Sequence, residues 1–312
     1  MTFPLLFFKM PGWRLAPASR NCFRIISLLV LVPLFAVLQA CSAAKIAYNQ
    51  APELGYWFMD GYFDFDSTQS LRVKADLGQL QAWHRQSQLP AYVETLQKLQ
   101  QQMRGDLSTA AACSIYDDVR RKLMAVSDRV EPTVVALAPT LQPAQLTHME
   151  GRFAKGNTEF REKFIDGTPA QKRATRLKQA ISRAEMLYGT LDEKQIAVLG
   201  QRIDQSLFNP ALNYAERLRR QQDTLQTLRA LTAPQASPVS TDRVRVALRS
   251  LFDRSLNSPD LAYREYVTRL TQDNCRTVAE LHNSTTPAQR AKAIETLTTY
   301  EQDLRVLMAQ KS

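Results

Sequence analysis

The sequence is poor in glycine, cysteine and histidine. Its 312 residues include 10 glycines, 4 cysteines and 3 histidines. The pairs Asn-Gly and Asp-Gly, which favour tight hairpin turns, occur only at Asp60-Gly61 and Asp166-Gly167. This scarcity of turn signals argues against a fold built from β-hairpins.

Sequence motifs that carry chemistry are also missing. The chain has no glycine-rich phosphate loop, no His-Glu-x-x-His run and no Cys-x-x-Cys pair, and its histidines, His84, His148 and His282, are scattered singly. We therefore expect that the protein is not an enzyme and that it has no catalytic residue, no cofactor and no metal ion.

No apolar run is long enough to span a bilayer, which takes about 20 residues. The longest is residues 25–38, preceded by four cations and no acidic residue. Residues 38–41 then read Leu-Gln-Ala-Cys, a lipobox. The pattern predicts a cleaved signal peptide over residues 1–40 and acyl chains, such as palmitate, on Cys41. The alternative is an uncleaved membrane helix with an incidental cysteine.

Much of the positive charge belongs to this leader. The whole chain has 40 Lys+Arg against 30 Asp+Glu. Removing the four leader cations leaves 36 against 30, so the net charge falls from +10 to +6. The remaining cations are dispersed and no nucleic-acid motif accompanies them, so we expect no nucleic-acid partner.

Cleavage and lipidation would leave two free cysteines, Cys113 and Cys275. An even number of thiols in an oxidising compartment favours a disulfide between them. The alternative is two separate buried thiols that pack as small hydrophobic side chains.

Apolar residues in the rest of the chain recur at intervals of three and four, the period of an amphipathic helix. Five helix starts share a cap-x-x-Gln pattern, at Asp66, Gln142, Thr168, Asp192 and Thr286. We expect an all-α fold, a multi-helix bundle or array of amphipathic helices, over residues 66–312. It forms one domain or two sub-bundles divided near residues 232–241, which contain two prolines.

Residues 41–65 form a lipid anchor and an aromatic lead-in segment, with seven aromatic residues between positions 48 and 65. We expect this segment to pack along the helical body. The functional alternative is an interfacial aromatic belt or a partner-binding surface. The residues proposed for partner binding are Tyr56, Trp57, Phe58 and Tyr62.

Three other groups of polar residues are candidates for chemistry. Trp83-His84-Arg85 lacks an identifiable nucleophile or metal, so we expect Trp83 in the core, His84 at its polar edge and Arg85 in solvent. The carboxylates of Asp60, Asp64 and Asp66 lack calcium-loop spacing. Asn157 is expected to make a polar contact inside the bundle or on the surface.

Several motifs together resemble a family of Gram-negative lipoproteins catalogued only as a domain of unknown function. They are Cys41-Ser42, Tyr48-Asn49-Gln50-Ala51-Pro52, Asp60-Gly61-Tyr62, Thr68-Gln69, Trp83-His84-Arg85, Leu89-Pro90-Ala91-Tyr92, Leu141-Gln142-Pro143-Ala144-Gln145, Asn157 and Gly189-Thr190-Leu191-Asp192-Glu193-Lys194-Gln195. The resemblance implies a helical lipoprotein without an established activity, and Ser42 after the cysteine implies export to the outer membrane.

The helix starts at Leu141 and Leu191 also look like the Leu-Thr-x-x-Gln motif of small periplasmic chaperones and envelope-stress proteins, with Gln142 and Asp192 in place of Thr. Two functions are therefore expected. The first is a non-enzymatic outer-membrane lipoprotein that faces the periplasm and binds other envelope proteins. The alternative is a chaperone-like protein that holds unfolded clients.

Overall fold

The fold is all-α, as the sequence predicts, in a computed structural model that describes residues 43–234 and 239–310. The described residues contain no β-strand. The predicted signal peptide and the lipidation site Cys41 lie outside the described residues. The chain divides into two units, residues 1–46 and 47–312, and the account below concerns the second.

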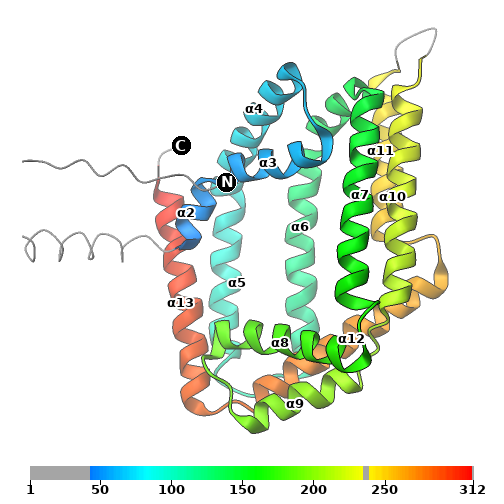
Figure 1. The fold of residues 1–312 in the computed structure, drawn as a ribbon. Helices are drawn as coiled ribbons and strands as arrows, with labels where there is room; N and C mark the ends of the chain where they lie inside the picture. The colour runs from blue at the N-terminus through cyan, green and yellow to red at the C-terminus, as the bar shows by residue number, and fades with distance from the viewer. Residues whose placement is uncertain (1–42, 235–238, 311–312) are drawn as a thin grey trace, which may run out of the picture. The chain divides into compact units, whose positions relative to one another are not determined.

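Figure 1 shows the helices in chain order. They are α2 (Ala43–Asn49), α3 (Ala51–Phe63), α4 (Ser67–Trp83), the π-helix η1 (His84–Gln88), α5 (Leu89–Gln102), α6 (Thr109–Leu137), the 3-10 turn η2 (Ala138–Thr140), α7 (Pro143–Phe164), α8 (Pro169–Tyr188), α9 (Glu193–Asp204), α10 (Pro210–Thr232), α11 (Thr241–Leu256), α12 (Leu261–Asn283) and α13 (Pro287–Ala309).

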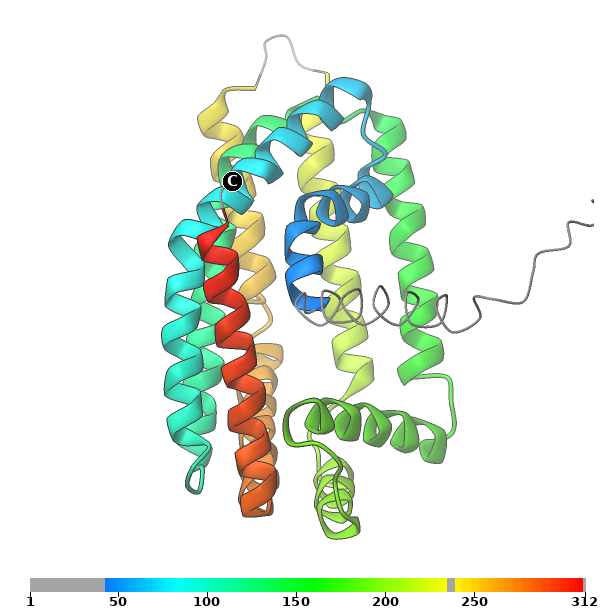
Figure 2. The same cartoon turned by 90° about the vertical axis from the view of Figure 1, so that its left-hand side faces the viewer.

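Helices distant in sequence pack against each other along their lengths. α13 lies beside α5, α12 contacts the long helix α6, and α10 contacts both α7 and α11 (Figures 1 and 2). α3 rests on α4 and α7. The predicted amphipathic stripes are thereby buried against one another.

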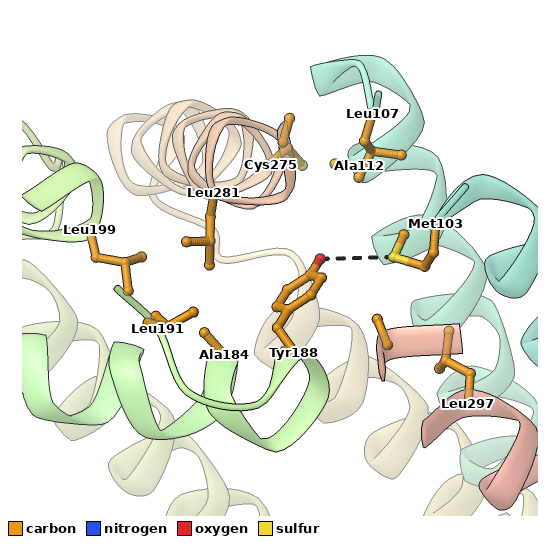
Figure 3. Close-up of a cluster of buried hydrophobic side chains, with 12 residues drawn as sticks. Met103, Leu107, Ala112, Ala184, Tyr188, Leu191, Leu199, Cys275, Leu281 and Leu297 are labelled. Atoms are coloured by element: carbon orange, nitrogen blue, oxygen red, sulfur yellow. Dashed lines mark hydrogen bonds between the residues drawn. The ribbon is translucent and has the colours of Figure 1, made fainter. Parts of the chain in front are cut away.

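Two hydrophobic cores hold these helices together. The first core comprises Met103, Leu107, Ala112, Ala184, Tyr188, Leu191, Leu199, Cys275, Ala279, Leu281, Ala293 and Leu297 (Figure 3). The second core comprises Val135, Ala138, Leu141, Leu146, Met149, Leu225, Leu228, Leu231, Val244 and Leu248. α6 contributes Ala112 near its start to the first core and Val135 near its end to the second, so it links them.

The segment around residues 232–241 does not separate these two cores. α10 before it and α11 after it contact each other and both contribute to the second core, through Leu228 and Val244. The two helices that flank this segment therefore belong to one core.

Cys113 on α6 and Cys275 on α12 form a disulfide, with a Cα–Cα distance of 5.2 Å. It joins residues 162 positions apart, and Cys275 belongs to the first core. A crosslink over so long a stretch restricts the unfolded chain strongly.

The first core also contains a buried series of hydrogen bonds. The Tyr188 hydroxyl lies 3.0 Å from Nδ1 of His282, and Nε2 of His282 lies 2.8 Å from the carbonyl oxygen of Gly105. Because the Gly105 carbonyl only accepts, Nε2 of His282 donates to it, and the Tyr188 hydroxyl also donates to Sδ of Met103 at 3.8 Å (Figure 3). Burial raises the pKa of Tyr188 to about 12, so the hydroxyl keeps its proton. These hydrogen bonds hold the turn after α5 against α12.

The five predicted helix starts all occur, and the third residue of each helix returns a hydrogen bond to the cap. At Asp66, Thr168, Asp192 and Thr286 the cap side chain also accepts from the amide of the glutamine. At Gln142 the Gln145 side chain accepts from the cap amide at 2.8 Å, whereas the Gln142 side chain donates to the Thr140 carbonyl. Gln142 is the weakest of the five caps, because its longer side chain bonds the Thr140 carbonyl and not the first turn of the helix.

Four of these glutamines form two pairs, in which Gln69, Gln145 and Gln195 are buried and Gln289 is half-buried. Gln69 at the start of α4 and Gln145 at the start of α7 exchange two side-chain hydrogen bonds, of 3.3 and 2.7 Å. Gln195 of α9 and Gln289 of α13 do the same, at 2.6 and 2.8 Å. Each pair therefore joins two helix N-termini that are distant in sequence.

The second amide proton of each glutamine is used in the same way in both pairs. It is donated to the backbone carbonyl two positions before the cap of the partner helix. The carbonyls are Thr140 for Gln69, Asp64 for Gln145, Ser284 for Gln195 and Thr190 for Gln289. Each side-chain carboxamide thus bonds the backbone amide of its own helix cap and a backbone carbonyl in the segment that leads into the partner helix. No buried nitrogen or oxygen atom of these carboxamides is left without a hydrogen bond.

We expect Gln195→Ala to lower the free energy of unfolding by about 2–4 kcal/mol, because it leaves one amide proton of Gln289, the Ser284 carbonyl and the Asp192 amide without partners inside the protein. Gln171→Ala is the matched control, since Gln171 caps α8 in the same local way but is exposed and has no glutamine partner. It should cost about 1 kcal/mol or less. Urea unfolding followed by circular dichroism measures both; equal losses would show that the pairing contributes nothing.

Candidate functional site

The most exposed apolar row near the N-terminus lies on α3. The exposed fractions are 47% for Leu54, 60% for Trp57 and 69% for Phe58. Their spacing of three and four places them on one face of the helix. Soluble proteins rarely expose contiguous large apolar side chains without a binding role. We call these three residues the α3 face.

The four residues proposed from sequence for partner binding divide into two exposed and two packed. Trp57 and Phe58 are exposed, but Tyr56 is half-buried, with its hydroxyl 3.0 Å from Oγ of Ser70 and Lys74 4.2 Å above its ring. Tyr62 is also half-buried, with its ring centroid 6.0 Å from that of Phe153. Packing and exposure therefore both occur along this helix.

Leu54 belongs to the α3 face, although attention to aromatic residues alone misses it. Its position three before Trp57 and four before Phe58 is the sequence signal that identifies it. Gly61 continues the same stripe one turn further, where its carbonyl lies 3.2 Å from Nε2 of His148.

An open groove runs below α3, between α3, α7, α10 and α12. Its volume is about 580 Å³. The aromatic residues that line it are Phe58, Tyr62, Phe63, Phe153, Phe160 and Tyr263. Phe58 therefore belongs both to the α3 face and to the edge of the groove, so the two surfaces are continuous.

The polar wall of the groove is formed by α10. Glu216 is buried and accepts hydrogen bonds from Arg219, Arg220 and Ser258. Burial opposes the ionisation of Glu216, but these hydrogen bonds outweigh it and hold the pKa of the carboxyl below its usual value. The hydrogen bonds of the Glu216 carboxylate are thus made within the protein, whereas Arg217 and Arg220 place positive charge along the groove.

Asn157, singled out in the sequence, lies on α7 and lines a neighbouring depression together with Gln221. It exchanges two hydrogen bonds with Gln221, at 2.8 and 3.0 Å, and accepts from Nε of Arg217 at 2.7 Å. Gly156 makes this possible, because a Cβ there would lie 2.8 Å from the Arg217 guanidinium. The polar contact is inside the bundle, between α7 and α10.

Trp83-His84-Arg85 is a structural cluster, and one of its members differs from expectation. Arg85 is buried, with 8% of its surface exposed, whereas the sequence predicts it in solvent. The reason is the π-helical turn η1, which begins at His84 and changes the register of the side chains after it. Arg85 therefore points inward and donates to Asn49 at 3.2 Å.

His84 lies between two tyrosines. Its Nδ1 is 3.1 Å from the Tyr48 hydroxyl and its Nε2 is 3.2 Å from the Tyr92 hydroxyl. Burial lowers the pKa of His84 and raises those of Tyr48 and Tyr92. Three motifs quoted above for the family resemblance, at residues 48–52, 83–85 and 89–92, thus meet here as a hydrogen-bonded cluster.

The acidic residues near α3 have local structural roles. Asp60 accepts from the amide of Phe65, and Asp66 caps α4. In the described ranges no group of three His, Cys, Asp or Glu side chains is placed to bind a metal ion. Within the same ranges no helix is both long and apolar enough to cross a membrane.

Fold and surface together define an all-α protein with two hydrophobic cores and an exposed aromatic helix next to a groove. Residues 61–239 match the model of a family of unknown function, DUF6279, and the chain belongs to this family. The expected membership of a family without assigned function is confirmed. No curated protein and no solved structure matches the chain.

The pH dependence of stability should carry a contribution from His84. Its folded-state pKa lies below the unfolded value of about 6.5, so its contribution to stability is complete above that pH and is lost as the pH falls through the folded pKa. We expect His84→Gln, which can still bond both tyrosines, to lose less thermal stability than the wild type between about pH 7 and pH 5. His148→Gln, at an exposed position, is the control; identical profiles for wild type and His84→Gln would contradict this role.

Proposed function

We propose that this protein is a non-enzymatic lipoprotein of the outer membrane that faces the periplasm and binds other envelope proteins through the α3 face and the adjoining groove. The observation that carries the proposal is the exposed row of Leu54, Trp57 and Phe58, held on a helix packed against α4 and α7. Large exposed aromatic residues of this kind are the usual anchors of protein interfaces.

The position of the α3 face in the chain supports a role close to the membrane. Leu54 follows Cys41 by 13 residues. Even a fully extended chain of this length spans at most about 45 Å. A lipid on Cys41 would therefore keep the α3 face near the bilayer surface, where it can meet other membrane-bound envelope proteins.

The chemistry of the groove indicates the kind of partner. Its floor is aromatic, and Arg217 and Arg220 line one side. Arg152 adds a third guanidinium, 5.6 Å from the centroid of the Tyr62 ring. We infer a partner segment with an apolar face and flanking acidic residues, so binding should weaken at high ionic strength.

The double variant Trp57→Ala/Phe58→Ala should reduce capture of such a partner by at least about tenfold, since buried aromatic anchors contribute about 2 kcal/mol or more each. The measurement is crosslinking in cells with the tagged full-length protein, followed by quantitative mass spectrometry. The crosslinked partner peptides should be apolar with acidic flanks.

The matched control is Leu71→Ala/Met186→Ala, which removes two side chains that are 74% and 68% exposed on α4 and α8. Both double variants should keep the helical circular dichroism signal. Unchanged capture by Trp57→Ala/Phe58→Ala would exclude the α3 face as a binding surface. A broad set of unfolded envelope proteins instead of a defined partner would favour the chaperone-like alternative.

The lipoprotein part of the proposal has its own test. Cys41→Ala should abolish incorporation of labelled palmitate and leave the leader uncleaved, because the thiol is the only group in the lipobox that can be acylated. Cys22→Ala, which changes a cysteine of the leader, should have no effect on labelling. Labelling that survives Cys41→Ala would refute the assignment.

A further inference from the structure

A second hollow lies next to the groove below α3, shares Met59, Phe63 and Thr224 with it, and is lined in part by residues of the second core. It has a volume of about 320 Å³ and lies between α3, α4, α6, α10 and α11. Its apolar wall includes Met59, Phe63, Val73, Leu80, Leu228 and Leu251. Protein cores contain few voids larger than a water molecule, so a hollow of this size is unusual.

The wall of the hollow is part of the rigid core. Val73, Leu141 and Leu228 are 2%, 3% and 5% exposed, and the latter two belong to the second core. The hollow is therefore a preformed site and not a crease between surface loops. Its apolar lining would not hold water well, since a buried water needs two to four polar partners.

The hollow continues toward a neighbouring depression. Val130, Val134 and Leu248 line both it and a depression of about 460 Å³ between α6 and α11. Val134 is 40% exposed, so the shared wall reaches the surface. Pro132 lies at this point inside α6 and also lines the hollow. The space is thus elongated along α6, which suits a chain-like occupant.

The charged residues that line the hollow are two arginines and one carboxylate, that of Asp76. Arg72 and Arg129 both line the hollow, and Arg72 is 3.6 Å from Asp76. The Arg129 guanidinium lies 5.9 Å from the centroid of the Trp83 ring. In the part of the chain that the structure describes, no carboxylate lies within 4.0 Å of Arg129. This arginine is available for an anionic group outside the fold.

We propose that the hollow binds the acyl chain of a long-chain fatty acid, with its carboxylate on Arg129. The volume lies at the lower end of the range for ligand pockets, about 300–1,000 Å³, and accommodates one chain but not two. A guanidinium and a carboxylate form paired, charge-assisted hydrogen bonds. This site is distinct from the α3 face, because Met59 and Phe63 line it whereas Trp57 and Phe58 do not.

The proposal is tested with a twelve-carbon fatty acid that carries a photoreactive diazirine in mid-chain, added to cells that express the full-length protein. After illumination, mass spectrometry should locate the crosslink on lining residues of α4, α6 or α10. Unlabelled dodecanoate should compete, and dodecyltrimethylammonium, with the same tail and the opposite charge, should compete at least about tenfold less well.

Two variants separate the head-group contact from the chain site. Arg129→Gln changes an exposed residue and should reduce crosslinking about tenfold, with partial recovery in Arg129→Lys. Leu80→Trp extends a ring into the hollow and should abolish crosslinking. Arg120→Gln, elsewhere on α6 and exposed, is the control and should have no effect.

Retention of the Cys113–Cys275 disulfide, read on a non-reducing gel, reports whether each variant is folded. Crosslinks confined to residues outside the hollow would overturn the proposal. Equal competition by the cationic amphiphile, or unchanged crosslinking in both folded Arg129→Gln and folded Leu80→Trp, would also overturn it.

Discussion

The hydrogen bonds between paired glutamines at helix N-termini are the constraint on which the rest of the structure depends. A helix start has free amides that need acceptors, and a glutamine at the third position supplies one for the cap. Here the same carboxamides also join Gln69 to Gln145 and Gln195 to Gln289. The first pair lies beside the second core and joins α4 to α7, whereas the second pair joins α9 to α13 beside the first core. A local capping interaction thus also links helix N-termini that are distant in sequence.

The two cores are then connected by one long helix, which a crosslink fixes to the first core. α6 passes from the first core to the second, and its start is bonded to α12 through Cys113–Cys275. Because apolar burial is non-directional, it would tolerate other pairings of these amphipathic helices. The directional contacts, which are the glutamine pairs, the disulfide and the Tyr188–His282–Gly105 chain, select the observed one.

The packing of α3 against the rest of the protein explains the binding surfaces proposed above. α3 covers the second core with Met59 and Phe63, and this cover is incomplete, since a hollow remains beneath it. The same two residues, together with Phe58 and Tyr62, also line a groove with arginines along one wall. The exposed Trp57 and Phe58 are held by a helix that is itself anchored through Tyr56 and Tyr62. One helix therefore contributes to an internal apolar space, an open groove and an exposed face.

The sequence by itself determined the helical class, the five helix starts and the aromatic character of residues 48–65, because periodicity and capping are local properties of the chain. It could not show that the glutamines of four caps pair, since pairing depends on which helix ends meet in space. Arg85 is predicted in solvent but is buried, because a π-helical turn shifts the register of the side chains. No local sequence pattern indicates this turn. Only the tertiary structure decided that Trp57 and Phe58 face outward while Tyr56 and Tyr62 pack, because exposure is set by the neighbouring α4 and α7 and not by the aromatic run itself.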